Sequence, residues 1–143
     1  MTRARTVLLV EDDLDIRDIL QDVLESDGFD VIPAANGKQA LDFLTMNDPP
    51  GADLVILDLM MPLITGWEVL DRMQENPRLA EIPVIVVSAV VRDKPGGAYT
   101  FLRKPFTLET LSIAVRRSLD TPAPGGNPGG ESGGEGGERV PQA

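Results

Sequence analysis

Short apolar runs alternate with longer amphipathic segments along most of the chain. Residues 6–10 form the first run, and residues 14–27 then repeat apolar positions with the period of an α-helix, which Gly28 ends. The apolar positions predicted for one face of this helix are Ile16, Ile19, Leu20, Val23 and Leu24. A weaker strand over residues 31–34 follows, and Asn36-Gly37 opens a second helix.

The same order continues through the second half. Apolar runs cover residues 54–57, 83–87 and 99–102, and helical patterns cover residues 66–74 and 108–119. Trp67, Leu70 and Met73 are predicted to share the inner side of the first of these helices. The runs lack a period of two, which indicates strands covered by helices on both faces. The predicted fold class is α/β, a doubly wound sheet of five parallel strands.

Polar side chains stand where four of these strands end. The residues concerned are Glu11-Asp12-Asp13, Asp58, Ser88 and Arg103-Lys104-Pro105. Each of them alone has an ordinary role in a cap, a turn or a solvated surface. In a doubly wound sheet, however, ligands bind outside the carboxyl ends of the strands. The shared position therefore predicts one site.

The residue types at this edge favour phosphoryl chemistry. Mg²⁺ prefers one or two carboxylates, waters and a phosphate oxygen, so Glu11, Asp12 and Asp58 suit it. Lys104 offers a point charge for a phosphate, and Ser88 offers one hydrogen bond. A carboxylate such as Asp58 can form an acyl phosphate when a metal and a cation neutralise the developing charge.

Composition excludes several other kinds of function. The 143 residues contain neither cysteine nor histidine, which removes disulfides, thiolate metal sites and histidine bases. A net charge of -10 disfavours direct binding of nucleic acid. No apolar run reaches the roughly 18 residues of a membrane span, and the N-terminal run is too short for a signal peptide. We therefore expect no membrane insertion and a cytoplasmic protein.

The chain changes character after Asp120. Residues 121–143 hold eight of the fourteen glycines and few apolar side chains. Such a segment cannot offset the entropy lost on ordering. We expect one folded domain over residues 1–120 and a disordered Gly/Pro-rich tail over residues 121–143.

Four stretches, in this order, carry a family resemblance: LLVEDDLDIRDIL, DLVILDLMMPLITGWEVL, PVIVVSA and FLRKPF. Across residues 5–119 the chain resembles the receiver domain of two-component response regulators, of the stand-alone type. The resemblance implies a flavodoxin-like fold with strand order 2-1-3-4-5 and five helices. It also implies signalling controlled by phosphorylation.

The resemblance assigns roles to the first half of the site. Asp58 accepts a phosphoryl group from a phosphohistidine on a partner histidine kinase or phosphotransfer protein. Asp12 binds Mg²⁺ directly, Glu11 holds it through water, and the backbone carbonyl of Met60 completes the set. Asp13 serves the N-terminus of the first helix.

The resemblance also assigns the residues of a switch to the second half of the site. Ser88 bonds a phosphoryl oxygen, Lys104 pairs with the phosphate, and the Lys104-Pro105 peptide bond is cis. Phe101 stands where the family has an aromatic residue that turns inward when the hydroxyl moves. A downstream protein that the sequence does not identify then binds the altered face, or the phosphoryl group is passed on.

The sequence departs from the family between Ser88 and Lys104. Only ten residues, 89–98, join the fourth and fifth predicted strands, and they include Pro95-Gly96-Gly97. A parallel crossover that contains a helix takes about 10 to 12 residues or more. The helix at this position, the fourth in the family, is therefore predicted to be short or irregular.

Three functions remain open from the sequence. The first is the phosphorylation-controlled receiver, and the second is a phosphorylation-independent docking domain whose switch is uncoupled. The third is a Mg²⁺-dependent phosphohydrolase, which Leu59-Met60-Met61 disfavours because no second acid or base follows Asp58. We expect no enzyme activity on a separate substrate. We also hypothesise that Met60 and Val90 border the site and slow the attack of water on the acyl phosphate.

Overall fold

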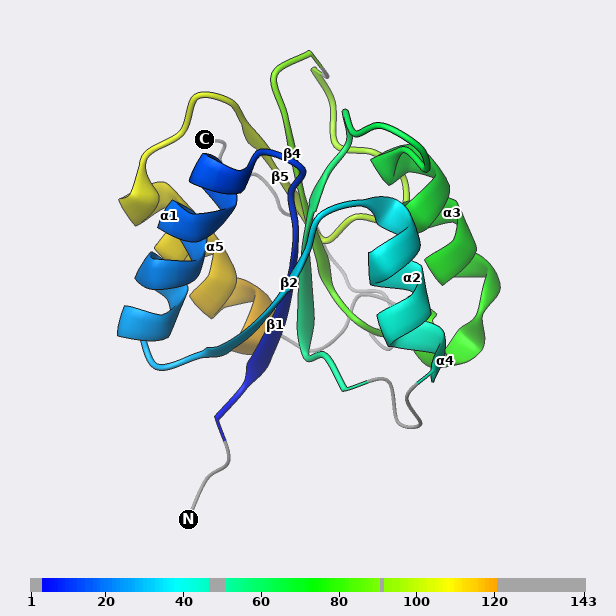
Figure 1. Ribbon diagram of the computed structural model, residues 1–143, viewed down its shortest axis with the longest axis horizontal. Coiled ribbons are helices and arrows are strands. Elements are labelled where there is room, and N and C mark those ends of the chain that lie inside the picture. Colours follow the sequence, from blue (N-terminus) through cyan, green and yellow to red (C-terminus); the bar gives the residue numbers. More distant parts are fainter. Residues whose placement is uncertain (1–3, 47–50, 91, 121–143) are drawn as a thin grey trace, which may run out of the picture.

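Five parallel strands form a single sheet in the computed structural model, which describes residues 4–46, 51–90 and 92–120 (Figure 1). Their order is β2-β1-β3-β4-β5, so the predicted fold class and strand order are confirmed. The bounds of the strands are β1 Thr6–Val10, β2 Asp30–Ala34, β3 Leu54–Asp58, β4 Val84–Ser88 and β5 Thr100–Arg103.

Helices cover both faces of the sheet. α1 (Leu14–Ser26) and α5 (Leu108–Asp120) lie on one face, and α2 (Gly37–Met46) and α3 (Gly66–Glu75) lie on the other (Figure 1). α4 is a single turn, Pro77–Ala80, directly after α3. Because all neighbouring strands pair in parallel, every strand delivers its last residue to the same edge.

The hydrophobic core consists of one cluster on each face of the sheet. Val55 and Leu57 pack toward α2 and α3, whereas Leu54 and Ile56 pack toward α1 and α5. β3 and β4 are buried at every residue, as expected for central strands between two helical layers. Each fully buried aliphatic side chain stabilises the fold by about 1.5–3 kcal/mol, and this packing fixes the strand ends.

Local signals set the ends of the helices. Asp13 is the N-cap of α1 and accepts a hydrogen bond from the amide of Ile16 at 3.1 Å, as predicted for this residue. Thr65 caps α3 through the amide of Glu68 at 3.3 Å. Gly28 follows α1 with a φ of 99°, a conformation that favours glycine.

Two side chains predicted for the core are exposed. Ile19 of α1 has 53% of its surface exposed, and Trp67 of α3 has 44%. The buried side of α3 is centred on Val69, Leu70 and Met73, and Trp67 lies about 100° around the helix from that centre. Ile19 holds the corresponding place beside the buried stripe of α1, so both residues border the core instead of entering it.

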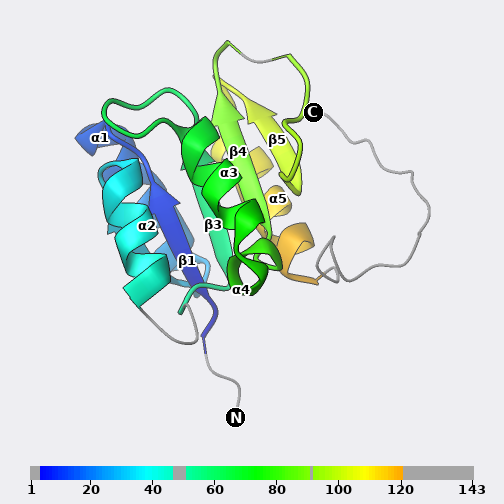
Figure 2. The same ribbon diagram turned by 90° about the vertical axis from the view of Figure 1, so that its right-hand side faces the viewer.

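The connection from β4 to β5 contains no helix within residues 89–90 and 92–99, which confirms the predicted irregular segment. Figure 2 shows this connection beside β5, which is an edge strand of the sheet. The sequence reading missed α4, because four residues are too few to show a helical period. Asn76-Pro77 was the available signal, since the Asn76 side chain caps α4 by accepting from the amide of Arg78 at 3.0 Å.

α5 extends to Asp120, the last of the described residues, so the predicted domain boundary there stays a prediction. The tail over residues 121–143 lies outside the described residues, so its disorder stays a prediction. Within the described ranges, no helix is both long and apolar enough to cross a bilayer.

Gly66 provides a test of the packing that fixes Asp58. A Cβ at Gly66 would lie 2.4 Å from the carbonyl oxygen of Asp58, whereas a Cβ at Gly96 would have no atom within 4 Å. Urea denaturation of Gly66→Ala should show a loss of about 1–3 kcal/mol in the free energy of unfolding. The matched control Gly96→Ala should stay within about 0.5 kcal/mol of wild type. Equal stabilities for the two variants would contradict this packing.

Candidate functional site

The predicted carboxylates meet at the edge formed by the carboxyl ends of the strands. Glu11 and Asp12 follow β1, and Asp58 ends β3. Carboxylate oxygens of these three residues lie within 4.8 Å of one another. Glu11 and Asp58 are buried, while Asp12 is exposed. This oxygen set matches the ligand preference of Mg²⁺, with Asp12 on the open side.

Lys104, just beyond β5, brings a cation to these carboxylates. Its ammonium Nζ lies 3.0 Å from Oδ2 of Asp58 and 3.4 Å from Oε1 of Glu11. Burial by itself lowers the pKa of Lys104, but the hydrogen bond and charge of Asp58, with those of Glu11, outweigh burial and raise the pKa. The side chain therefore stays a cation over the physiological pH range.

Glu11 is held through its backbone and its side chain. Its amide donates to the carbonyl of Ala34 at 3.0 Å, and its carbonyl accepts from Nη1 of Arg17 at 2.8 Å. Oε2 of Glu11 accepts from the amide of Asp13 at 3.1 Å. Burial raises the pKa of Glu11 to about 7, and the charge of Asp58 adds to this, although Asp13 and Lys104 oppose it.

Asp58 is fixed from both sides of its carboxylate. Oδ2 accepts from Lys104, and Oδ1 accepts from the amide of Met60 at 2.9 Å. The backbone that follows is tied down as well, because the amide of Gly66 donates to the carbonyl of Leu59 at 3.1 Å. Asp58 is therefore a buried, oriented carboxylate at the centre of the site.

Ser88 connects the ends of β4 and β5. It is fully buried, and its hydroxyl oxygen accepts from the amide of Val90 at 3.1 Å. Its carbonyl accepts from the amide of Lys104 at 2.9 Å. The Lys104-Pro105 peptide bond is cis, as predicted.

The remaining predicted residues surround this centre. Phe101 is half-buried against the core cluster on the α2 and α3 face. Met60 and Val90 are 58% and 63% exposed, so they are not packed into the core. The geometry does not test the metal-binding role predicted for the Met60 carbonyl.

Sequence reasoning missed two residues that shape the site, Arg17 and Gly66. Arg17 follows Asp13 by one helical turn, and this spacing turns its side chain back toward the end of β1. Gly66 opens α3, and the absence of a Cβ lets the helix approach the backbone of Asp58. The Thr65-Gly66 pair at the predicted helix start was the available signal for Gly66.

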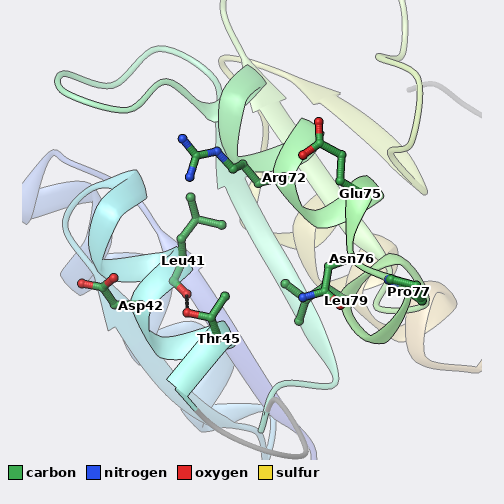
Figure 3. Close-up of a pocket in the computed structure, with 8 residues that line it drawn as sticks. All are labelled: Leu41, Asp42, Thr45, Arg72, Glu75, Asn76, Pro77 and Leu79. Carbon is green, nitrogen blue, oxygen red and sulfur yellow. Dashed lines mark hydrogen bonds between the residues drawn. The ribbon is translucent and has the colours of Figure 1, made fainter.

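A hollow of about 490 Å³ lies elsewhere, between α2 and the α3–α4 pair (Figure 3). Its lining comes from the ends of these helices, at the opposite end of the sheet from Asp58: Leu41, Asp42, Thr45, Arg72, Glu75, Asn76, Pro77 and Leu79. None of the predicted site residues is among them. The hollow is therefore separate from the carboxylate site.

Comparison with known proteins agrees with the geometry. The family model of the response regulator receiver domain matches residues 7–116. The chain belongs to this family.

Several relatives illustrate the match. Sporulation initiation phosphotransferase F of Bacillus subtilis (strain 168) is 37% identical, over 79% of this chain and 92% of its own. The DNA-binding regulator RpaA of Synechocystis is 34% identical, and the chain spans only 48% of its length. The response regulator TrrA of Thermotoga maritima, solved in complex with Mg²⁺-BeF, has a TM-score of 0.71 and 28% identity, covering 80% of this chain and 99% of its own.

The pKa of Glu11 predicts a pH dependence of stability. Because the folded-state pKa of about 7 exceeds the ordinary value of 4.5, folding favours the protonated carboxyl, and stability falls as the pH rises between these values. Urea denaturation in EDTA should show wild type losing roughly 1–3 kcal/mol more than Glu11→Gln between about pH 5 and pH 8. Parallel pH profiles for the two proteins would contradict the assignment.

Proposed function

We propose that this chain is a phosphorylation-controlled receiver of the cytoplasm. Asp58 accepts a phosphoryl group from the phosphohistidine of a histidine kinase or phosphotransfer protein, with Mg²⁺ as cofactor. The observation that carries the proposal is the position of the Asp58 carboxylate, 3.0 Å from the Lys104 ammonium and within 4.8 Å of the other two carboxylates.

The transfer is a displacement at phosphorus. A carboxylate oxygen of Asp58 forms the new bond to phosphorus, the phosphorus–nitrogen bond breaks, and the imidazole of the donor leaves with its electron pair. Lys104 is placed to stabilise the negative charge on the phosphoryl oxygens. Glu11, Asp12, Asp58 and the Met60 carbonyl would hold Mg²⁺, which when bound neutralises the charge shared by carboxylates and phosphoryl group.

Ser88 and Phe101 form the switch in this proposal. A phosphoryl group offers acceptor oxygens only, so the Ser88 hydroxyl donates to one of them and moves toward Asp58. The end of β4 moves with Ser88, and Phe101 fills the vacated space. A downstream protein that prefers this arrangement binds it selectively.

Two observations bear on how the signal leaves the protein. The chain covers 92% of sporulation phosphotransferase F, and that likeness supports a relay of the phosphoryl group. Residues 89–90 and 92–99 between β4 and β5 form no helix, and this favours the second candidate, a docking domain that does not respond to phosphorylation. A phosphohydrolase is the least supported function, because Leu59, Met60 and Met61 supply no acid or base beside Asp58.

Acetyl phosphate with Mg²⁺ separates the first two functions. The receiver should gain the mass of one phosphoryl group, located at Asp58 by peptide mass spectrometry, and the amide resonances around Phe101 should shift. Asp58→Asn should gain nothing, because an amide cannot form the acyl phosphate, and the surface control Asp71→Asn should behave as wild type. No gain in wild type, or a gain without shifts near Phe101, would favour the docking domain.

Met60 tests the lifetime of the phosphorylated state. If this exposed side chain shields the acyl phosphate, Met60→Asn should admit water and speed the decay several-fold, measured as loss of the phosphorylated mass. Leu63→Asn is the matched control, because Leu63 is an exposed apolar residue of the same loop. Its φ of 67° is one that asparagine tolerates. If the acyl phosphate of Met60→Asn decays no faster than that of wild type, the shielding role is refuted.

A further inference from the structure

We propose that phosphorylation changes the position of α3, and that Gln74 of α3 couples this helix to the β4–β5 connector. The connector is defined as residues 89–90 and 92–99. This inference rests on the proposed function and concerns its output. It follows from the contacts that the connector, which forms no helix in its described residues, makes with Ser88 and with Gln74.

The connector begins at the group that phosphorylation moves. The amide of Val90 donates to the hydroxyl oxygen of Ser88 at 3.1 Å. In the proposed switch the Ser88 side chain moves toward a phosphoryl group on Asp58, and this movement carries its oxygen away from the Val90 amide. The first residues of the connector therefore change position whenever Ser88 does.

The far half of the connector is a closed turn. The amide of Ala98 donates to the carbonyl of Pro95 at 3.2 Å, and Nζ of Lys94 donates to the carbonyl of Ala98 at 2.8 Å. Pro95 and Ala98 are buried, and the amide of Tyr99 donates to the carbonyl of Val84 at 2.8 Å. Only three residues of the sequence separate Val90 from Lys94, so the chain joins this turn directly to the start of the connector.

Gln74 joins this turn to α3. Its Nε2 donates to the carbonyl of Gly97 at 3.4 Å, a long bond, but the packing around it is close. A Cβ at Gly97 would lie 2.9 Å from both Cγ and Cδ of Gln74, and the φ of Gly97 is 90°. The connector turn at residues 95–98 therefore cannot move toward the C-terminal end of α3 without displacing Gln74.

The other end of α3 touches the phosphoacceptor itself. Gly66 packs against the carbonyl of Asp58, and its amide donates to the carbonyl of Leu59. Asp58 thus contacts the start of α3, and Ser88 reaches its last turn through the connector and Gln74. The contacts from Asp58 and from Ser88 thus both end on α3. A movement of these two residues on phosphorylation is therefore expected to shift the position of this helix.

The test follows backbone amide resonances of the isotopically labelled protein with and without Mg²⁺ and beryllofluoride. In wild type, shifts should appear at Asp58, Ser88 and Val90, and also at Gly97 and residues 72–75. Gln74→Ala should keep the first group of shifts and lose at least half of the shift at residues 72–75. Lys94→Met, which opens the turn, should have the same effect.

Glu75→Ala is the matched control, because Glu75 neighbours Gln74 on the exposed side of α3 and should leave every shift in place. Full retention of the α3 shifts in Gln74→Ala, or wild-type shifts confined to β5 and α5, would overturn the inference. If shifts at Asp58 and Ser88 are themselves absent, the proposed function fails first and the inference falls with it. If wild type shows shifts at Asp58 and Ser88 but none in α3, the inference is wrong and the proposed function still stands.

Discussion

The ion pair between Lys104 and Asp58 is the interaction on which the arrangement of the site depends. Two carboxylates that are 3% and 5% exposed lie together, and without a cation they would repel each other in a poorly hydrated place. Lys104 reaches them from the end of β5, which pairs with β4 and where the Lys104 amide is bonded to the carbonyl of Ser88. The cation that pairs with Asp58 here is thus the one that the proposed function pairs with a phosphoryl group on Asp58.

The fold supplies this geometry through its parallel sheet. β3 and β4 are buried on both faces, so Asp58 and Ser88 end rigid strands, while the exposed Asp12 leaves one side of the site open. The energy of the core is spread over two clusters, one on each face of the sheet. The site itself costs free energy, because burial raises the pKa of Glu11 and the charge of Asp58 adds to this, and the surrounding packing offsets the cost.

Much of the fold could be predicted from the sequence because buried parallel strands read as short apolar runs. The predicted ends of strands and helices differ from the structure by at most one residue, and the edge shared by Asp58, Ser88 and Lys104 followed from topology. Ile19 and Trp67 were misplaced, because a helical period does not tell how wide the buried stripe is. Arg17 and Gly66 were missed, since their effect depends on tertiary contacts with the backbone.

The irregular β4–β5 connector was predicted from its length, but its contact with Gln74 could be seen only in the structure.

The site roles themselves are tested most directly by a crystal structure of the protein with Mg²⁺ and beryllofluoride. The account predicts beryllium bonded to the Asp58 carboxylate, fluorines facing Lys104 and Ser88, and the metal held by Glu11, Asp12, Asp58 and the Met60 carbonyl. A fluoride complex bound elsewhere, or Mg²⁺ held without Asp12 and Asp58, would contradict it.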